Sequence, residues 1–365
     1  MENQFIEALQ KGLFKPFNSS KLTLNNRIVM APMTRGFSKD GIPDDHVAAY
    51  YRRQAKSGVG LIITEGTLID HPAASANPDW PHIHGEQALA GWAKVVAAVH
   101  EEGGKIVPQL WHLGTARKAG SLPNPEALPI GPSGLDAEGN KVNEPLAEGE
   151  IADLILAYAK AAAAAKENGF DGIELHGAHG YLIDQFFWAQ TNRRTDKYGG
   201  DVRGRTRFAA EVVQACRSAV GPDFPILFRF SQWKGGHYEA KLAQTPEQLE
   251  QLLSPLVDAG VDVFHASTRQ FWQPEFEHSS LNLAGWTKKL TGRPTVTVGS
   301  IALDQSFWQQ TEIVRRLAEL LEQGEADLAA IGRSLLSNPQ WVSQVRENRL
   351  SDWATYDSDL LKTLN

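Results

Sequence analysis

The stretch Glu174-Leu175-His176-Gly177-Ala178-His179-Gly180-Tyr181 follows a helical run and a short apolar strand. Two histidines and a tyrosine are therefore predicted just past the carboxyl end of a strand. Imidazoles three residues apart can both hydrogen-bond one oxygen of a bound molecule, and a nearby phenol can deliver a proton. The alternatives are a metal pair or a structural turn, although no third ligand such as Cys or Glu stands at metal spacing beside the pair.

The same strand belongs to a rhythm that runs along the whole chain. Eight short β-branched or apolar runs are predicted as strands: 27–32, 59–65, 105–111, 172–176, 226–231, 261–266, 294–299 and 327–332. Helical stretches separate most of them, at 44–57, 87–102, 151–168, 205–220, 246–259 and 312–323. Strands that alternate with helices in this way favour an α/β fold in which a parallel sheet closes into a (β/α)8 barrel, or TIM barrel. We expect one such domain over residues 1–365.

Three regions are not part of the strand–helix repeat that forms a (β/α)8 barrel. Residues 12–26 hold two short apolar runs around a turn, which predicts an N-terminal hairpin covering the bottom of the barrel. Residues 113–150 are rich in Gly and Pro and are expected to cap the top, and residues 180–204 form a long connection after the fourth strand. Long ordered loops in a compact domain usually serve function.

Composition excludes several classes of protein. The chain has 365 residues, 42% of them hydrophobic, with a net charge of −7 and no Lys/Arg block, so neither a nucleic acid nor an acidic membrane is an expected partner. The single cysteine, Cys216, allows no intrachain disulfide and no cysteine-held iron–sulfur cluster. No signal peptide or bilayer-length apolar run is found, so a cytoplasmic protein is expected, as a monomer or a homo-oligomer.

Two further strand ends point to a phosphate site. In such barrels the chemistry lies on the face formed by the carboxyl ends of the strands. Val298-Gly299-Ser300 and Ile331-Gly332-Arg333 close the predicted seventh and eighth strands. Phosphate often binds there to backbone N–H groups, and Arg333 can grip it with two donors. Either motif alone could be a structural turn.

Taken together, these residues resemble the Old Yellow Enzyme family, whose members are FMN-dependent ene-reductases built on a (β/α)8 barrel. The resemblance runs in register from about residue 13 to residue 341. It rests on six motifs that stand in the family's order: Asn26-Arg27-Ile28-Val29-Met30-Ala31-Pro32-Met33-Thr34-Arg35, Thr64-Glu65-Gly66-Thr67, Gln109-Leu110-Trp111-His112, the His176/His179/Tyr181 cluster, Thr191-Asn192-Arg193-Arg194-Thr195-Asp196-Lys197-Tyr198-Gly199-Gly200 and Ile331-Gly332-Arg333.

The resemblance implies a set of positions around a non-covalently bound FMN. These positions are Ala31, Pro32, Met33, Thr34, Gly66, Gln109, Arg229, Gly299, Ser300, Gly332 and Arg333. The hydroxyl of Thr34 is expected near flavin O4, where a hydrogen bond helps to set the reduction potential. Gly66 is expected to allow a close backbone approach, and Gln109 to pair with the pyrimidine edge. Arg229 is expected beside N1 and O2, where its charge stabilises the reduced ring.

The resemblance also implies a reaction in two halves. NADPH or NADH first reduces the flavin and leaves, and an α,β-unsaturated carbonyl or nitro compound then takes its place. His176 and His179 are expected to hold the oxygen of this substrate while hydride reaches its β-carbon. Tyr181 is expected to protonate the α-carbon, since a phenol with a pKa of about 10 still carries its proton at neutral pH. Trp111 is expected beside the same substrate, and no metal is expected.

Other interpretations explain less of the sequence. A dienoyl-CoA-type reductase on the same barrel needs cysteines for a cluster and a second nucleotide domain. Other FMN barrels, such as those that oxidise dihydroorotate or hydroxy acids, share the phosphate site but not the His176/His179/Tyr181 cluster. A flavin-binding scaffold without activity would not need an acid and an electrophile. Three aromatic residues after the fifth and sixth strands either line the substrate mouth or pack within loops: Trp233, Phe271 and Trp272.

Overall fold

A closed barrel of eight parallel strands forms the centre of the computed structural model, which describes residues 2–364. The order around the barrel is β10-β3-β4-β5-β6-β7-β8-β9. The strands are β3 Ile28–Met30, β4 Leu61–Leu68, β5 Ile106–Trp111, β6 Ile173–His179, β7 Ile226–Lys234, β8 Val263–Ser267, β9 Thr295–Val298 and β10 Leu328–Ile331. Nearly every strand residue is buried, as expected when helices cover a parallel sheet. The predicted (β/α)8 barrel and its strands are confirmed, with ends that shift by a few residues.

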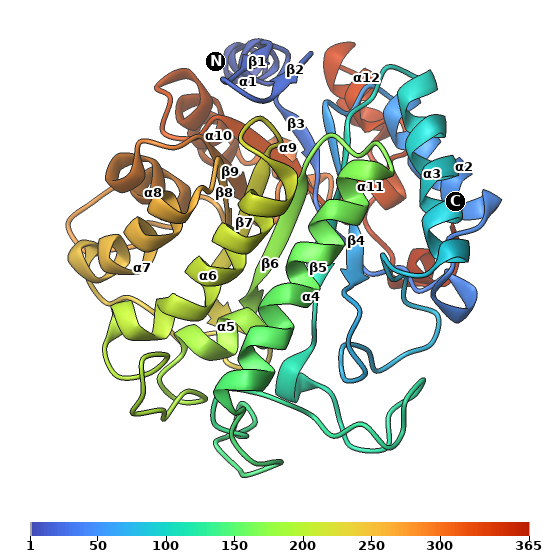
Figure 1. The fold of residues 1–365 in the computed structure, drawn as a ribbon. Coiled ribbons are helices and arrows are strands. Elements are labelled where there is room, and N and C mark those ends of the chain that lie inside the picture. Colours follow the sequence, from blue (N-terminus) through green and yellow to red (C-terminus); the bar gives the residue numbers. More distant parts are fainter. Residues whose placement is uncertain (1, 365) are drawn as a thin grey trace.

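Helices surround the barrel (Figure 1). Those that follow the strands are α2 Asp45–Lys56, α3 Glu86–Glu101, α4 Glu148–Glu167, α6 Val202–Val220, α7 Pro246–Ala259, α8 Leu283–Thr291 and α10 Thr311–Glu322. Local sequence explains their ends: Thr245 caps α7 by accepting the N–H of Gln248, and Gly260 ends that helix in the left-handed conformation. The six predicted helices are confirmed, whereas α8 was not predicted; it is only nine residues long.

A small hairpin closes the amino-terminal end of the barrel. Its strands, β1 Phe17–Asn18 and β2 Thr23–Leu24, pair antiparallel. Phe17, Leu22 and Leu24 are buried against the apolar residues with which the barrel strands begin, such as Leu227 and Val263. In Figure 1 this hairpin and helix α1, Glu2–Leu13, lie at the opposite end of the barrel from the loops after β5. The predicted hairpin cover is confirmed.

Three aspartates lock pairs of strands together at this amino-terminal end. Asp171, Asp262 and Asp327 each stand just before β6, β8 or β10. Each exchanges two hydrogen bonds with the first residue of the preceding strand: its N–H donates to the carbonyl, and its Oδ2 accepts the N–H at 2.9 Å. Each carboxylate also binds a lysine. The register of the barrel is therefore fixed at the end away from the strand tips that carry the candidate site.

Residues 113–150 form an irregular segment over the carboxyl ends of β5 and β6, the cap segment. It begins with the short helix η2, Gly114–Ala116. Arg117 is buried behind it and donates hydrogen bonds to backbone carbonyls, among them those of Ser75, Ser121 and Asn124. One buried guanidinium thus organises a stretch that has little regular structure. The predicted long connection after β6 contains a helix that was not predicted, α5 Leu182–Phe187.

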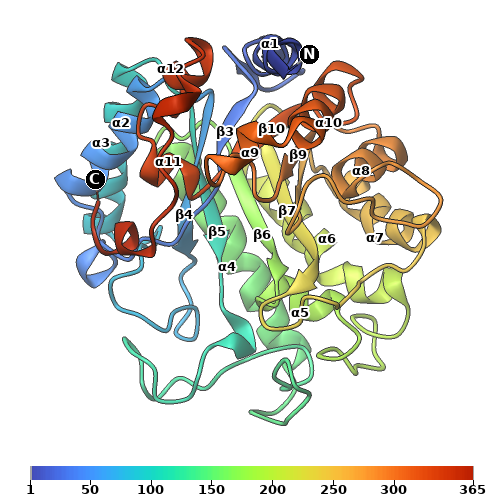
Figure 2. The same ribbon diagram turned by 180° about the vertical axis from the view of Figure 1, so that it is seen from behind.

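The C-terminal part of the chain wraps around the side of the barrel. It contains α9 Ser306–Gln309, α11 Ser334–Ser337, α12 Trp341–Arg346, η3 Leu350–Asp352 and η4 Ser358–Lys362. Figure 2 shows its last residues, in red, beside α2 and α3. Arg53 of α2 donates to the carbonyl of Leu364 at 2.6 Å, which ties the two segments together. Among the helices that the structure describes, none has the length and apolar character to cross a membrane.

Replacing Asp262 should test the aspartate locks. This carboxylate, 13% exposed, binds Lys21 of the hairpin turn at 2.6 Å and Arg217 of α6 at 2.5 Å, besides the N–H of Ile226. Hydrogen bonds to a charged group are each worth about 1.5–3 kcal/mol, so Asp262→Ala should lower the free energy of unfolding by about 2 kcal/mol or more. Denaturant unfolding measures this loss. The exposed Asp258 provides the control, and an equal effect of Asp258→Ala would contradict the assignment.

Candidate active site at the carboxyl ends of the strands

The end of β6 departs from regular strand geometry. Side chains of a strand alternate between its two faces, so residues 176 and 179 would normally point to opposite sides. Here the pairing with β7 shifts between Gly177 and His179, and His179 has a φ of +66°. Gly177 is required at this point, because a Cβ would lie 2.5 Å from the ring of Phe228. Such a bulge re-aims a side chain, and here it brings the two imidazoles together.

Four aromatic rings gather around this strand end. The ring of His176 lies 5.1 Å from that of His179 and 5.1 Å from that of Tyr181, edge to face in both cases. Trp111, at the end of β5, lies 4.9 Å from Tyr181 and 6.3 Å from His176. The structure therefore brings the predicted histidine pair, the tyrosine and Trp111 into one cluster. None of its members belongs to a group of three His, Cys, Asp or Glu residues able to hold a metal within residues 2–364.

Burial keeps this cluster uncharged. The pKa values of His176 and His179 lie well below the ordinary histidine value, mainly because both rings are buried and secondly because Arg229 is close. Burial also raises the pKa of Tyr181. At neutral pH the site therefore presents two neutral imidazoles and a protonated phenol. The Nδ1 of His176 accepts the N–H of Ala178 at 3.3 Å, so the proton of this imidazole is on Nε2.

Side chains from β7 and β8 hold His179 in place. Its Nε2 lies 2.8 Å from the hydroxyl of Ser267 at the end of β8, and its ring stacks on Trp233 of β7 at 4.4 Å. Arg229 donates weakly to the same hydroxyl, at 3.4 Å. A hydroxyl that accepts from Arg229 can donate its own proton to His179 Nε2, and in that arrangement the ring proton of His179 is on Nδ1.

Beside His179 opens a cavity of about 310 Å³, the strand-end cavity, at the tips of β3 and β7 to β10. It unites most of the residues predicted around the cofactor. Of those predicted residues, its walls contain Ala31, Pro32, Met33, Arg229, Gly299, Ser300, Gly332 and Arg333, and His179 lines it as well. Thr34, Gly66 and Gln109 do not line it. Residues from both ends of the sequence thus meet around one space.

The floor of this region is a buried polar chain. Glu174 accepts the Nε2 of Gln109 at 2.8 Å with one carboxylate oxygen and the Nδ1 of His265 at 2.7 Å with the other. All three side chains are at most 3% exposed. The Nε2 of His265 and the Nε of Arg229 are buried without a hydrogen-bond partner. Buried polar groups are normally satisfied, so these orphaned atoms fit a polar group, such as the pyrimidine edge of a flavin, bound in the site.

Thr34, which follows β3, and Gly66 of β4 lie outside the lining of the strand-end cavity. Thr34 is exposed, and the two residues after it, Arg35 and Gly36, donate their N–H groups to the buried carboxylate of Glu65 at 2.8 and 3.0 Å. Burial raises the pKa of Glu65 to about 7. A Cβ on Gly66 would lie 2.4 Å from the ring of Trp111, so its packing against Trp111 already requires glycine. A flavin contact of Gly66 stays a prediction.

The predicted phosphate residues do meet at one place. Gly299 has a φ of +147°, and a Cβ there would lie 2.7 Å from the carbonyl oxygen of Thr268. Ser300 follows in the left-handed region, with a φ of +56°. The guanidinium of Arg333 lies over the ring of Tyr356 at 5.3 Å and forms no ion pair with the described residues. The guanidinium donors of Arg333, at the wall of the strand-end cavity, are therefore not used in an ion pair.

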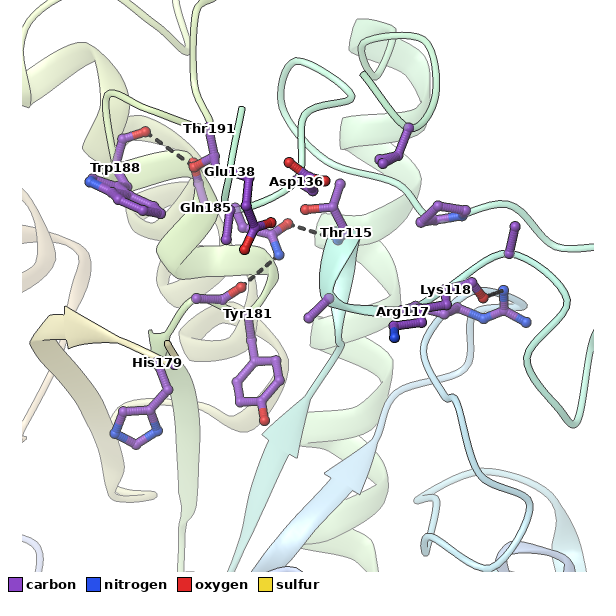
Figure 3. Close-up of a pocket in the computed structure, with 17 residues that line it drawn as sticks. Thr115, Arg117, Lys118, Asp136, Glu138, His179, Tyr181, Gln185, Trp188 and Thr191 are labelled. Carbon is purple, nitrogen blue, oxygen red and sulfur yellow. Dashed lines mark hydrogen bonds between the residues drawn. The ribbon is translucent and has the colours of Figure 1, made fainter. Parts of the chain in front are cut away.

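A second, larger cavity is lined in part by the turn of residues 179–181. It measures about 540 Å³ and separates α5 from the cap segment (Figure 3). The rings of His179 and Tyr181 point away from Asp136 and Glu138 of the cap segment. Gln185 crosses this space: it accepts the N–H of Thr115 and donates to the carbonyl of Gly180 at 2.7 Å. His179 lines both cavities and Tyr181 lines the larger one, so the two cavities adjoin at the end of β6.

The three undecided aromatic residues take different places. Trp233 lines the strand-end cavity and stacks on His179, so it belongs to the site. Phe271 is completely buried and packs against Phe307 and the half-buried Trp272, so Phe271 and Trp272 are loop packing.

Sequence reasoning did not identify Ser267 and His265, which come from β8. Strand alternation places these two residues on the same face as the predicted sites, and that pattern was the available signal.

Comparisons with known proteins show the family to which the chain is similar. The family model of NADH:flavin oxidoreductase / NADH oxidase proteins matches residues 12–352. The chain is 34% identical over 361 residues to 12-oxophytodienoate reductase 7 of Oryza sativa subsp. japonica, an alignment that covers 93% of this chain and 89% of that protein. It is 35% identical over 356 residues to a NADH oxidase of Thermoanaerobacter brockii, with 93% of this chain aligned to 52% of the relative, so it spans about half of that protein's length.

Solved structures of similar proteins share the fold of this chain. Morphinone reductase in complex with tetrahydroNAD superposes with a TM-score of 0.82 at 29% identity. The superposition covers 96% of this chain and 94% of the other.

The protonation states of the histidine pair can be measured directly. Nitrogen-detected NMR of the protein should show His176 neutral with its proton on Nε2. Both rings should stay neutral at about pH 6, where a histidine with the ordinary pKa of about 6.5 is mostly protonated. The reason is that burial and Arg229 both disfavour a second positive charge. Protonation of either ring above about pH 6 would show that the site carries charge and would contradict this assignment.

Proposed function

This chain belongs to the NADH:flavin oxidoreductase / NADH oxidase family, and on that premise we propose that it reduces the activated C=C bond of α,β-unsaturated carbonyl or nitro compounds. The family uses FMN, and relatives named NADH oxidase and NADPH dehydrogenase indicate a nicotinamide dinucleotide as the donor. The relative 12-oxophytodienoate reductase 7 bears a name that describes an unsaturated ketone as its substrate. The observation that carries the proposal is the meeting of two neutral imidazoles and a protonated phenol at the end of β6.

We assign the strand-end cavity to FMN. Arg229 and Gln109 would face the pyrimidine edge of the ring, and the tips of β9 and β10 would hold the phosphate through Gly299, Ser300, Gly332 and Arg333. Ala31, Pro32, Met33, Thr34 and Gly66 would lie along the ring itself. When bound, FMN supplies the hydride for the double bond. A single barrel domain would then carry both the cofactor and the substrate.

The histidine pair would act on the oxygen of the substrate. His176 offers a proton on Nε2, and His179 offers one on Nδ1 because its Nε2 faces Ser267. Negative charge develops on that oxygen as hydride reaches the β-carbon, and two fixed N–H donors stabilise it. A donor of this kind is worth about 3 kcal/mol in a site sheltered from water. Because both rings are neutral, their protons stay in place and the oxygen is polarised without being protonated.

Tyr181 would deliver the proton that completes the reaction. Its burial raises the pKa of the phenol, so the proton is present at neutral pH. The ring is fixed edge-on against Trp111 at 4.9 Å, and its backbone N–H donates to the carbonyl of Ala178. A phenol held in this way can protonate one carbon of a substrate whose oxygen is bound by the neighbouring histidines.

Tyr181→Phe should separate the two half-reactions. Reduction of the flavin by NADPH should be almost unaffected, while reoxidation by cyclohexenone should slow by about 10²–10⁴-fold, the usual contribution of a general acid. Nitroalkenes should lose less, because their nitronate product is stable before protonation. Anaerobic stopped-flow absorbance measures both steps. Tyr158→Phe is the matched control, since Tyr158 is fully buried in α4. Equal losses in both half-reactions would mean that Tyr181 is structural.

Arg333→Ala should weaken the binding of FMN. A charge-assisted contact with phosphate is worth about 1.5–3 kcal/mol, so the dissociation constant should rise at least tenfold. Fluorescence of FMN released on dilution measures it. Arg346→Ala provides the control, because Arg346 also lies over an aromatic ring, that of Phe14, but at the opposite end of the barrel. If both variants retain FMN like the parent, the phosphate is bound elsewhere.

A further inference from the structure

A fully buried ion pair lies beneath the turn that carries His179 and Tyr181. Lys234 is the last residue of β7, and Asp184 lies in α5. Their charged atoms are 2.9 Å apart, and both side chains are 0% exposed. Every other ion pair between an aspartate or glutamate and a lysine or arginine of the described residues is at least partly exposed. Nothing in the reaction outlined above uses this pair.

Each partner holds one side of the turn. Lys234 donates to the carbonyls of Ser231 and Gln232 at 3.2 and 2.9 Å, and its ammonium faces Oδ1 of Asp184 as an ion pair. The other oxygen of Asp184 accepts the N–H of Gly180 at 2.7 Å. Gly180 adopts a φ of +87°, and a Cβ on it would lie 3.7 Å from the Cβ of Lys234. The pair thus joins the end of β7 to the residue between His179 and Tyr181.

The same strand end also binds His179 through the backbone. The N–H of His179 donates to the hydroxyl of Ser231, and the N–H of Gly235 donates to the carbonyl of His179. Ser231 is therefore bound by Lys234 at its carbonyl and by His179 at its hydroxyl. Lys234 also adds to the positive charges that lower the pKa of His179, after burial and the effects of Arg229 and His176.

Stability alone is a poor reason for such a pair. Removing two charges from water is costly, and well-packed apolar residues of similar volume often replace a buried pair without loss. Here the pair has a specific geometric effect, because it fixes Gly180, the residue between His179 and Tyr181. We propose that Asp184 and Lys234 are positioning residues that set the relation between His179 and Tyr181 for proton and hydride delivery to one substrate, an inference that rests on the proposed function.

The test compares two double variants of the FMN-loaded enzyme. Single variants leave one buried charge unpaired and are expected to fold poorly. Asp184→Leu/Lys234→Met removes both charges and also the acceptor for Gly180. It should slow reoxidation by cyclohexenone by about 10²-fold, the cost of a misplacement of about 1 Å, and leave reduction by NADPH little changed. Asp184→Asn/Lys234→Met keeps an oxygen for Gly180 and should recover part of the rate. Hydrogen exchange should show the amide of Gly180 less protected in the first variant than in the second.

A control pair separates positioning from general stability. Lys288 and Asp327 form a 2.7 Å ion pair at the amino-terminal end of β10, and Asp327→Leu/Lys288→Met should lower stability without a selective effect on reoxidation. The proposal is overturned if the first double variant reoxidises like the parent, if both half-reactions slow equally, or if neither double variant folds with FMN. A parent enzyme that cyclohexenone does not reoxidise would instead overturn the proposed function, and the role of the pair with it.

Discussion

The shift in pairing between β6 and β7 is the constraint on which the site depends. Without it, strand alternation would send His176 and His179 to opposite faces. The shift, together with the left-handed conformation of His179, turns both rings toward one space beside Tyr181. It is possible because Gly177 lets the backbone pass the ring of Phe228. A local irregularity in one strand thus creates the arrangement of donors that a regular barrel strand could not present.

Neutrality of the donors follows from where they are placed. His176 is buried, and His179 and Tyr181 are half-buried, among Trp111, Trp233 and the strand tips, so the charged form of each is disfavoured. Arg229 is the positive charge that acts on both histidines, and its Nε is a buried donor without a partner. This division suits an enzyme of the family, because the cation can stabilise the reduced cofactor while neutral N–H groups polarise the substrate. The aspartate locks at the other end of the barrel leave the strand tips free to carry these groups.

The sequence predicted the parts of this structure that depend on local pattern. Apolar runs predicted the barrel strands, and the glycines at the tips of β9 and β10 were predicted as part of one site and do line one cavity. The partners that hold the site came from contacts distant in sequence, which pattern does not reveal. Glu174 meets His265 across 91 positions, and Asp184 and Lys234 meet only after α5 folds back on β7.

Helices α5 and α8 escaped prediction for a related reason. They are short, and tertiary packing stabilises them more than their own sequence does.

The most direct test of the account is a titration of the FMN-loaded protein with para-hydroxybenzaldehyde. If His176 and His179 hold an oxygen over the flavin, this phenol should bind as phenolate, with a lowered pKa and a long-wavelength charge-transfer band, because hydrogen bonds to a charged form favour it. The band and the affinity should both fall in His176→Ala/His179→Ala. They should persist in His82→Ala/His84→Ala. This variant removes another close histidine pair, whose rings stack 4.1 Å apart and do not line the strand-end cavity. An unchanged band in the first double variant would show that the oxygen is held elsewhere and would contradict the assignment of the site.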